Sequence, residues 1–175
     1  MLAPDAWVAL AAVSRPHGLK GELRLKLFNQ DSDVLLSLDE VLVRLDGGIE
    51  HEVSVDHVRR AGDDVLMKLY SVDDRDRAAE LRGALVCARR SSFPELEEGE
   101  FYVCDVLGAR VVFPTGEELG EVRELLHYPA SQVLVVRAAD GGKDWEVPLM
   151  DRFVQEVDAA GGVVRLVTLD GLERG

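Results

Sequence analysis

The sequence ELRLKL at residues 22–27 decides the fold class. It alternates strictly, so that three leucines lie on one face of an extended strand and three charged side chains lie on the other. The same period of two returns at residues 41–45, 53–58 and 65–69. Turn-forming residues separate these runs, for example DGG at residues 46–48. Many short strands with one apolar face predict a small closed β-barrel.

One segment interrupts the alternation. Residues 73–82 start with aspartates that can cap a helix, continue with helix-favouring residues and stop before a glycine. They predict a helix of about two and a half turns, with Ala78, Leu81 and Ala79 facing inward. Residues 84–88 then return to a strand.

The best candidate for a domain boundary is residues 91–99, where serine, proline, glycine and acidic residues replace the alternation. We therefore expect a first barrel over residues 1–90, a linker over 91–99 and a second domain over 100–175. Further strands are expected in the second domain at residues 101–103, 110–113, 119–126, 132–138, 145–149 and 163–169. The predicted fold class is mainly all-β, built from two small β-barrels.

The chain is acidic, with 20 Lys and Arg against 33 Asp and Glu and a formal charge of −13. Such a charge disfavours generic binding to nucleic acids or anionic membranes. Residues 1–95 carry 13 basic and 17 acidic side chains, a net −4, whereas residues 96–175 carry 7 and 16, a net −9. The acidic second half favours a basic partner such as a ribosomal protein, although it would equally serve solubility alone. Residues 13–28 differ, with four cations against one carboxylate.

Nothing in the sequence marks out a catalytic, metal or cofactor site. His51 and His57 lie six residues apart, which is not the spacing of a helical metal pair. Cys87 and Cys104 form no CxxC pair and are expected to be small buried hydrophobic residues in a reduced, cytoplasmic chain. The longest apolar run, residues 7–13, is far shorter than the ~20 residues that span a bilayer and is interpreted as a strand.

The segment PHGLKGE at residues 16–22 combines glycines and charged side chains in a pattern that packing alone does not require. Its two glycines stand three residues apart and permit positive φ or close backbone approach. Around them lie Arg15, His17 and Lys20, with Arg24 on the following strand, and these side chains suit a phosphate or a carboxylate. The alternative is an ordinary strand-to-strand loop with solvated charges.

The aromatic pair Phe101 and Tyr102 is the second unusual feature. Adjacent residues of a strand point to opposite faces, so the two rings cannot both enter one core. Either one of them is exposed, where tyrosine is a favoured interface anchor, or both fill the seam between the barrels. Asp105, followed by Leu107 and Gly108, indicates a turn into the next strand.

The chain resembles the RimM family of ribosome maturation factors along nearly its whole length. The matching segments are residues 16–22, residues 73–83, Glu100-Phe101-Tyr102 with Asp105, Leu107 and Gly108, residues 116–122 and residues 147–149. Several ordered motifs across two domains make a chance match improbable.

The resemblance implies an amino-terminal barrel similar to translation-factor domains and a carboxy-terminal PRC-barrel. It also implies a non-catalytic factor that binds the small-subunit head protein numbered nineteen and promotes head assembly of the 30S precursor and maturation of its 16S rRNA. Family binding is associated with an aromatic pair, and the basic loop would then touch rRNA phosphates. The implicated residues are Phe101, Tyr102 and Asp105 for the ribosomal protein, and Arg15, His17, Lys20 and Arg24 for rRNA. We expect a monomer that needs no cofactor, metal or membrane.

Two other function classes stay open. An enzyme that processes rRNA ends would show activity of the pure protein on precursor rRNA, although no acid–base or metal constellation is evident. A barrel that binds flavin or another small molecule is suggested by shared topology alone, and fold does not fix function. An absorbance spectrum of the purified protein would reveal a bound flavin.

Overall fold

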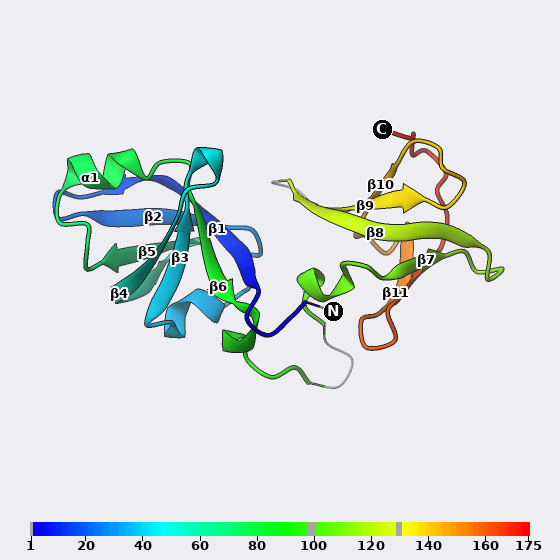
Figure 1. The fold of residues 1–175 in the computed structure, drawn as a ribbon, viewed down its shortest axis with the longest axis horizontal. Helices are drawn as coiled ribbons and strands as arrows, with labels where there is room; N and C mark the ends of the chain where they lie inside the picture. The colour runs from blue at the N-terminus through cyan, green and yellow to red at the C-terminus, as the bar shows by residue number, and fades with distance from the viewer. Residues whose placement is uncertain (1, 98–100, 129–130) are drawn as a thin grey trace. The chain divides into compact units, whose positions relative to one another are not determined.

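The computed structural model describes residues 2–97, 101–128 and 131–175 and is dominated by β-strands (Figure 1). The chain divides into two compact units, residues 3–94 and residues 95–175. Within the described residues, no helix is both long enough and apolar enough to cross a membrane.

The first unit is a closed barrel of six antiparallel strands in the order β1-β2-β5-β4-β3-β6. A closed barrel leaves no strand edge unpaired. Its strands are β1 (Trp7–His17), β2 (Glu22–Leu27), β3 (Glu40–Arg44), β4 (Glu50–Ala61), β5 (Asp64–Leu69) and β6 (Leu85–Arg89). Each strand that the sequence predicted in this half of the chain is confirmed.

The alternation of β2 works as the sequence predicted. Leu23, Leu25 and Leu27 are buried in the barrel core, while Lys26 between them is exposed. The core is completed by apolar residues of the other strands, chiefly Val13, Val41, Val43, Val65, Met67, Leu69 and Val86. Burial of leucine and valine side chains at roughly 1.5–3 kcal/mol each stabilises the barrel.

A single α-helix is described, α1 (Arg75–Glu80), within the region predicted at 73–82. Asp74 caps it, since its Oδ1 accepts a hydrogen bond of 2.8 Å from the backbone N–H of Arg77. Ala78 is buried and Leu81 packs on the barrel core, as predicted, but Ala79 is exposed and that prediction was wrong. On a helix, one residue is turned by about 100° from the next, so Ala79 leaves the buried face. The other described helices are short 3₁₀ turns at Val34–Ser37, Asp46–Gly48, Arg90–Ser92 and Val103–Val106.

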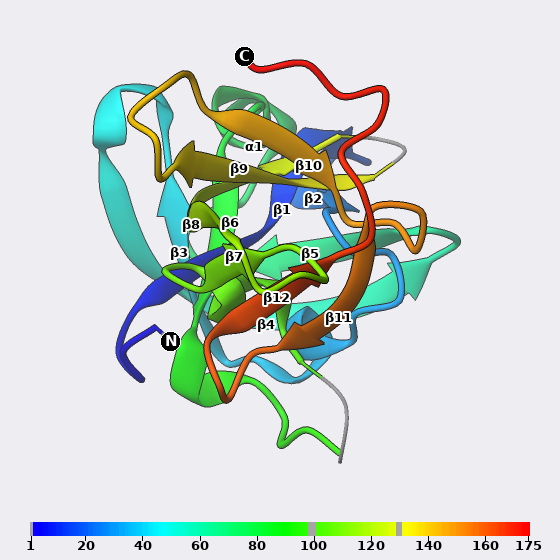
Figure 2. The ribbon, with the colours of Figure 1, turned by 90° about the vertical axis from the view of Figure 1, so that its right-hand side faces the viewer.

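The second unit contains one six-stranded sheet in the order β10-β9-β8-β7-β12-β11. The strands are β7 (Arg110–Val112), β8 (Glu118–His127), β9 (Gln132–Ala138), β10 (Trp145–Pro148), β11 (Val154–Asp158) and β12 (Val163–Leu166). Figure 2 shows β12 beside β7, and this pair is parallel whereas the other pairs are antiparallel. The inward side chains form a second core, which includes Val106, Val111, Leu134, Val147, Val164 and Leu166.

In the second unit, one predicted strand was wrong and one strand was not predicted. The strand expected at residues 101–103 is absent, because the chain enters a 3₁₀ turn at Val103 instead. Strand β11 was missed because Gln155 and Glu156 interrupt the alternation, and its register shifts between Val154 and Glu156. The linker expected over 91–99 contains the point where one unit ends and the next begins, but its bounds stay a prediction, since residues 98–100 lie outside the described residues.

Candidate functional site

The loop that joins β1 to β2 is shaped by its two glycines. Gly18 and Gly21 have φ of +66° and +89°, which L side chains rarely adopt. A Cβ at Gly21 would overlap the backbone carbonyl of Val72, so the loop packs directly on the turn after β5. Arg75 Nη1 also donates to the carbonyl of Gly18 at 3.0 Å. The loop therefore lies at the same end of the barrel as α1 (Figure 1).

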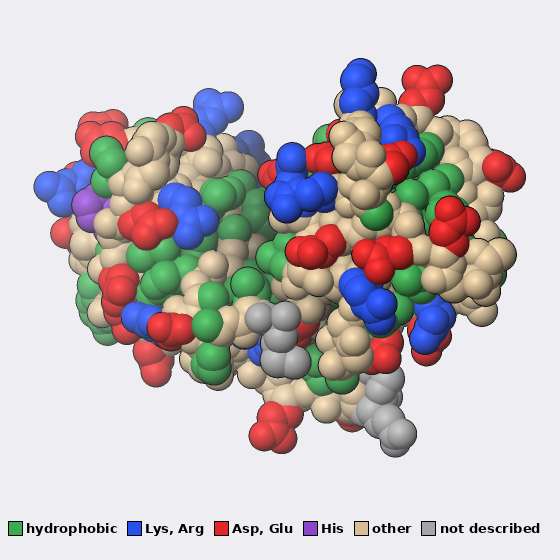
Figure 3. Space-filling model, turned by 45° about the vertical axis from the view of Figure 1, so that its right-hand side comes forward, with side chains coloured by type: hydrophobic (Ala, Val, Ile, Leu, Met, Phe, Trp, Pro, Cys, Tyr) green, Lys and Arg blue, Asp and Glu red, His purple; other side chains and the backbone are tan. Residues whose placement is uncertain are grey.

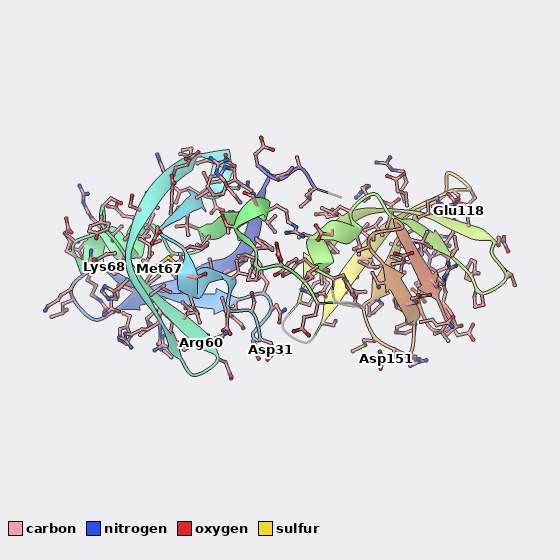
Figure 4. All side chains as sticks on the ribbon, turned by 90° about the horizontal axis from the view of Figure 1, so that it is seen from below. Asp31, Arg60, Met67, Lys68, Glu118 and Asp151 are labelled. Atoms are coloured by element: carbon pink, nitrogen blue, oxygen red, sulfur yellow. The ribbon has the colours of Figure 1, made fainter. Side chains whose placement is uncertain are left out.

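Lys68 fixes the other side of this contact. Its Nζ donates to the carbonyls of Leu69 and Val72 and lies 3.6 Å from Asp73 Oδ1. Figure 4 labels Lys68 at this end of the barrel. Lys68 thus helps to hold the turn on which Gly21 rests, and Arg77 Nη1 also donates to the carbonyl of Ser71 in this turn at 3.3 Å.

The predicted basic residues are brought to one part of the barrel, but they differ in availability. Arg15 and Lys20 are exposed, and His17 is half-buried. Arg24 is also half-buried, and its guanidinium is held by Asp64 at 3.0 Å. Arg15 lies opposite Arg24 in the β1–β2 register, so these two side chains share the outer face of the barrel.

The aromatic pair lies in an irregular segment before a 3₁₀ turn rather than on a strand. Phe101 and Tyr102 are both half-buried, and Phe101 packs against the core of the second unit. The carbonyl of Tyr102 accepts a hydrogen bond of 2.8 Å from the backbone N–H of Asp105, which closes the turn. The two rings are therefore not required to point to opposite faces, and both residues are partly exposed.

Asp105 is the only buried charged residue in the described part of the chain, with 6% of its surface exposed. Its backbone closes the turn after Tyr102, and the chain then bends at Gly108, which has φ +80°. The turn predicted at Asp105, Leu107 and Gly108 is confirmed. The backbone N–H of Asp105 thus ties this residue to the aromatic segment, and its contact with a ribosomal protein stays a prediction.

The acidic charge of the second unit forms no single dense patch on the face seen in Figure 3, where Asp and Glu side chains are interspersed with Lys and Arg. Several of these carboxylates are paired, for example Asp144 with Arg123 at 2.6 Å and Asp140 with Arg174 at 2.7 Å. The hydrogen bond from Arg174 lowers the pKa of Asp140 from its usual value.

The histidines and cysteines weighed as metal ligands are His51, His57, Cys87 and Cys104. His51 and His57 are both exposed on β4, and the described residues contain no group of three or more His, Cys, Asp or Glu side chains arranged to hold a metal ion. Cys87 is buried, as expected, and burial raises the pKa of its thiol. Cys104 is only half-buried.

Sequence reasoning missed two residues near the basic loop, Arg59 on β4 and Tyr70 after β5. Arg59 Nη2 of β4 lies 3.4 Å from Glu22 Oε2 of β2, and these two residues are 37 positions apart in the sequence. Tyr70 is 64% exposed. Tyr70 continues the alternation of positions 64, 66 and 68, so its outward direction could have been predicted from the sequence. The pairing of β5 with β2 and β4 could not, because no local pattern reports it.

Two family models match the chain. The model of the RimM N-terminal domain matches residues 8–93, and that of the RimM PRC barrel domain matches residues 103–172. The matched ranges correspond to the two compact units.

Two relatives compared by sequence give the same result. A ribosome maturation factor RimM from Sorangium cellulosum is 48% identical over 166 residues, which cover 95% of this chain and 97% of the relative. One from Thiobacillus denitrificans is 36% identical and covers 93% of this chain and 84% of the relative. The solution structure of the N-terminal domain of RimM from Thermus thermophilus is 28% identical, with a TM-score of 0.42, and covers 52% of this chain and 98% of that domain. The chain belongs to the RimM family.

Proposed function

We propose that the chain is a non-catalytic assembly factor of the small ribosomal subunit. It binds the basic head protein numbered nineteen, contacts 16S rRNA nearby and so promotes head assembly and rRNA maturation. Family membership supports this role, because both units match RimM domains and the relatives are named ribosome maturation factors. The observation that carries the proposal is the half-buried aromatic pair Phe101 and Tyr102 in an acidic unit.

The aromatic segment is suited to docking because it is both partly exposed and held in place. Phe101 is anchored in the core of the second unit, and the turn closed by Asp105 fixes the backbone at Tyr102. A ring that is ordered before binding loses little rotamer entropy when the partner covers it. Asp105 positions this segment through its backbone N–H and is also a proposed contact of the ribosomal protein. The net −9 charge of residues 96–175 mainly raises the rate of encounter with a basic protein.

The basic loop of the first barrel is the proposed rRNA contact. Arg15 and Lys20 are exposed and can approach a phosphate, and His17 lies between them. Arg24 already pairs with Asp64, so a phosphate that binds Arg24 must compete with this carboxylate or share the guanidinium with it. Because these contacts are electrostatic, RNA binding should weaken as the salt concentration rises.

The test is a titration of the full chain against the isolated head protein. We expect the double substitution of Phe101→Ala and Tyr102→Ala to weaken binding by at least about 30-fold, the ~2 kcal/mol that defines an interface hot spot. Tyr128→Ala is the matched control, since Tyr128 is a 50% exposed tyrosine of the same unit. Circular dichroism checks that each variant is folded. Unchanged affinity of a folded double variant would place the binding surface elsewhere.

The non-catalytic part of the proposal has its own measurement. Purified protein incubated with precursor 16S rRNA should leave the RNA ends intact. Trimming of the ends by the protein alone would contradict it.

A further inference from the structure

The outer face of the first barrel gathers cations from four strands. Arg15 of β1 lies opposite Arg24 of β2, Arg24 lies opposite Leu66 of β5, and Leu66 lies opposite Arg59 of β4. Directly opposed residues of antiparallel strands point to the same side of the sheet. Three arginines and one leucine therefore form a single row across the outside of the barrel.

Leu66 lies between two of these arginines in the cross-strand register. It is 1% exposed although it does not belong to the barrel core, so it is covered from outside. Its cross-strand neighbours Arg24 and Arg59 have long aliphatic stems that suit this cover. Their guanidinium groups are held by Asp64 at 3.0 Å and by Glu22 at 3.4 Å. Each of these two guanidinium groups thus has a carboxylate partner on the same face.

Other cations on this face are unpaired. The described residues offer Arg15, Lys20 and Lys26 no carboxylate within ion-pair distance. The carboxylates on or beside the face are Glu22, Asp56, Asp64 and Asp73, against the cations Arg15, Lys20, Arg24, Lys26, Arg59 and Lys68. On a chain of net charge −13 this face is locally cationic. A polyanion is therefore its complementary ligand.

An exposed aromatic ring lies at the end of the same face. Tyr70 continues the outward positions 64, 66 and 68 of β5, and its backbone N–H donates to the carbonyl of Ser54 at 3.2 Å. Tyr70 directly follows β5, which is paired with β2 and with β4, and it stands four positions along the chain from Leu66. Tyr70 is 64% exposed, and Leu19 in the neighbouring loop is 78% exposed.

We propose that this face binds unpaired RNA, with phosphates along Arg15, Arg24 and Arg59 and an unstacked base on Tyr70. Cationic surfaces with an exposed aromatic ring are the common solution for single strands, because every base offers a face on which the ring can stack. A duplex keeps its bases stacked and would use the cations alone. The inference rests on the proposed rRNA contact and adds to it the form of the RNA, the residue Arg59 and the role of Tyr70.

The test is fluorescence anisotropy of the full chain with a short labelled RNA of mixed sequence, used as a single strand and annealed to its complement. We expect the single strand to bind more tightly. Tyr70→Ala should weaken single-strand binding by about 5-fold to 150-fold, which corresponds to ~1–3 kcal/mol of base stacking, and should leave duplex binding unchanged. Tyr70→Phe keeps the ring and should bind as the unsubstituted chain does.

Tyr128→Ala is the matched control, because it removes an exposed tyrosine from the other unit. Arg59→Gln should lower the slope of log affinity against log salt by about 0.7, the value for one phosphate contact on a single strand. The proposal is overturned if the chain binds neither RNA, if it prefers the duplex, or if Tyr70→Ala and Tyr128→Ala behave alike.

Failure here is distinguishable from failure of the proposed function. Tyr70→Ala should leave the titration against the isolated head protein unchanged. If that titration succeeds while the RNA measurements fail, only the RNA surface is wrong. If the RNA measurements succeed while the double aromatic variant still binds the head protein normally, the docking surface is wrong and the RNA surface stands.

Discussion

Replacement of Gly21 by alanine should destabilise the first barrel far more than replacement of Gly18. Both glycines have positive φ, a conformation that costs an L residue roughly 1–2 kcal/mol. At Gly18 the added Cβ meets nothing within 4 Å, so this strain is the whole cost. At Gly21 the Cβ overlaps the backbone carbonyl of Val72, and the required shift adds about 1–3 kcal/mol. We therefore expect losses of about 1–2 kcal/mol for Gly18→Ala and about 2–5 kcal/mol for Gly21→Ala.

Urea unfolding followed by the fluorescence of Trp7 measures this difference. Trp7 belongs to β1 and has the Arg89 guanidinium 4.3 Å from its ring, so unfolding of the barrel changes its surroundings. A Trp145→Phe background removes the signal of the second unit. Both Gly→Ala changes lower the conformational entropy of the unfolded chain by the same amount, so this stabilising contribution cancels when the two variants are compared. With a slope of about 1–3 kcal/mol per M urea, the Gly21→Ala midpoint should lie about 1 M below that of Gly18→Ala. Equal midpoints would refute the packing of the loop on the turn.

Three further outcomes follow from individual contacts. Burial raises the pKa of the Cys87 thiol, so at neutral pH a thiol reagent should label Cys104 first and reach Cys87 only after unfolding; simultaneous labelling would contradict this. The hydrogen bond from Arg174 lowers the pKa of Asp140, so this pair stabilises the carboxy-terminal tail above the ordinary carboxyl pKa and that stability is lost as the pH falls through the lowered value. The protection of the tail amides, relative to the intrinsic exchange rate at each pH, should therefore fall over this range, and Arg174→Gln should abolish that pH dependence. Asp74→Ala removes the helix cap and should lower the free energy of unfolding of the barrel by about 1 kcal/mol; no change would mean that the cap is not formed in solution.

Much of the fold follows from short-range pattern. The alternation at residues 22–27 fixes which leucines enter the core, and Asp74 with the glycine at 83 brackets the helix, so both features were predictable. β11 was not, because two polar residues between Val154 and Val157 give no period of two. The closed order of the strands depends on pairings such as β3 with β6, which join segments that the local sequence does not connect.

In the candidate sites, too, the features set by local sequence were predictable and those set by strand pairing were not. The loop glycines and Arg15 were recognisable because they lie within one short segment. Arg59 joins them only through the pairing of β4 with β5 and of β5 with β2, and no local pattern reports that neighbourhood. For the aromatic pair, the residues were identified but their conformation was not, because the apolar run at 101–103 suits a strand as well as an extended entry into a 3₁₀ turn.

Co-sedimentation with immature small ribosomal subunits measures whether the aromatic pair docks the chain on its particle. The full chain should travel with the particles, and the folded variant with Phe101→Ala and Tyr102→Ala should remain at the top of the gradient while Tyr128→Ala travels normally. Retention of the double aromatic variant on the particles, or failure of the unsubstituted chain to bind them, would contradict the account.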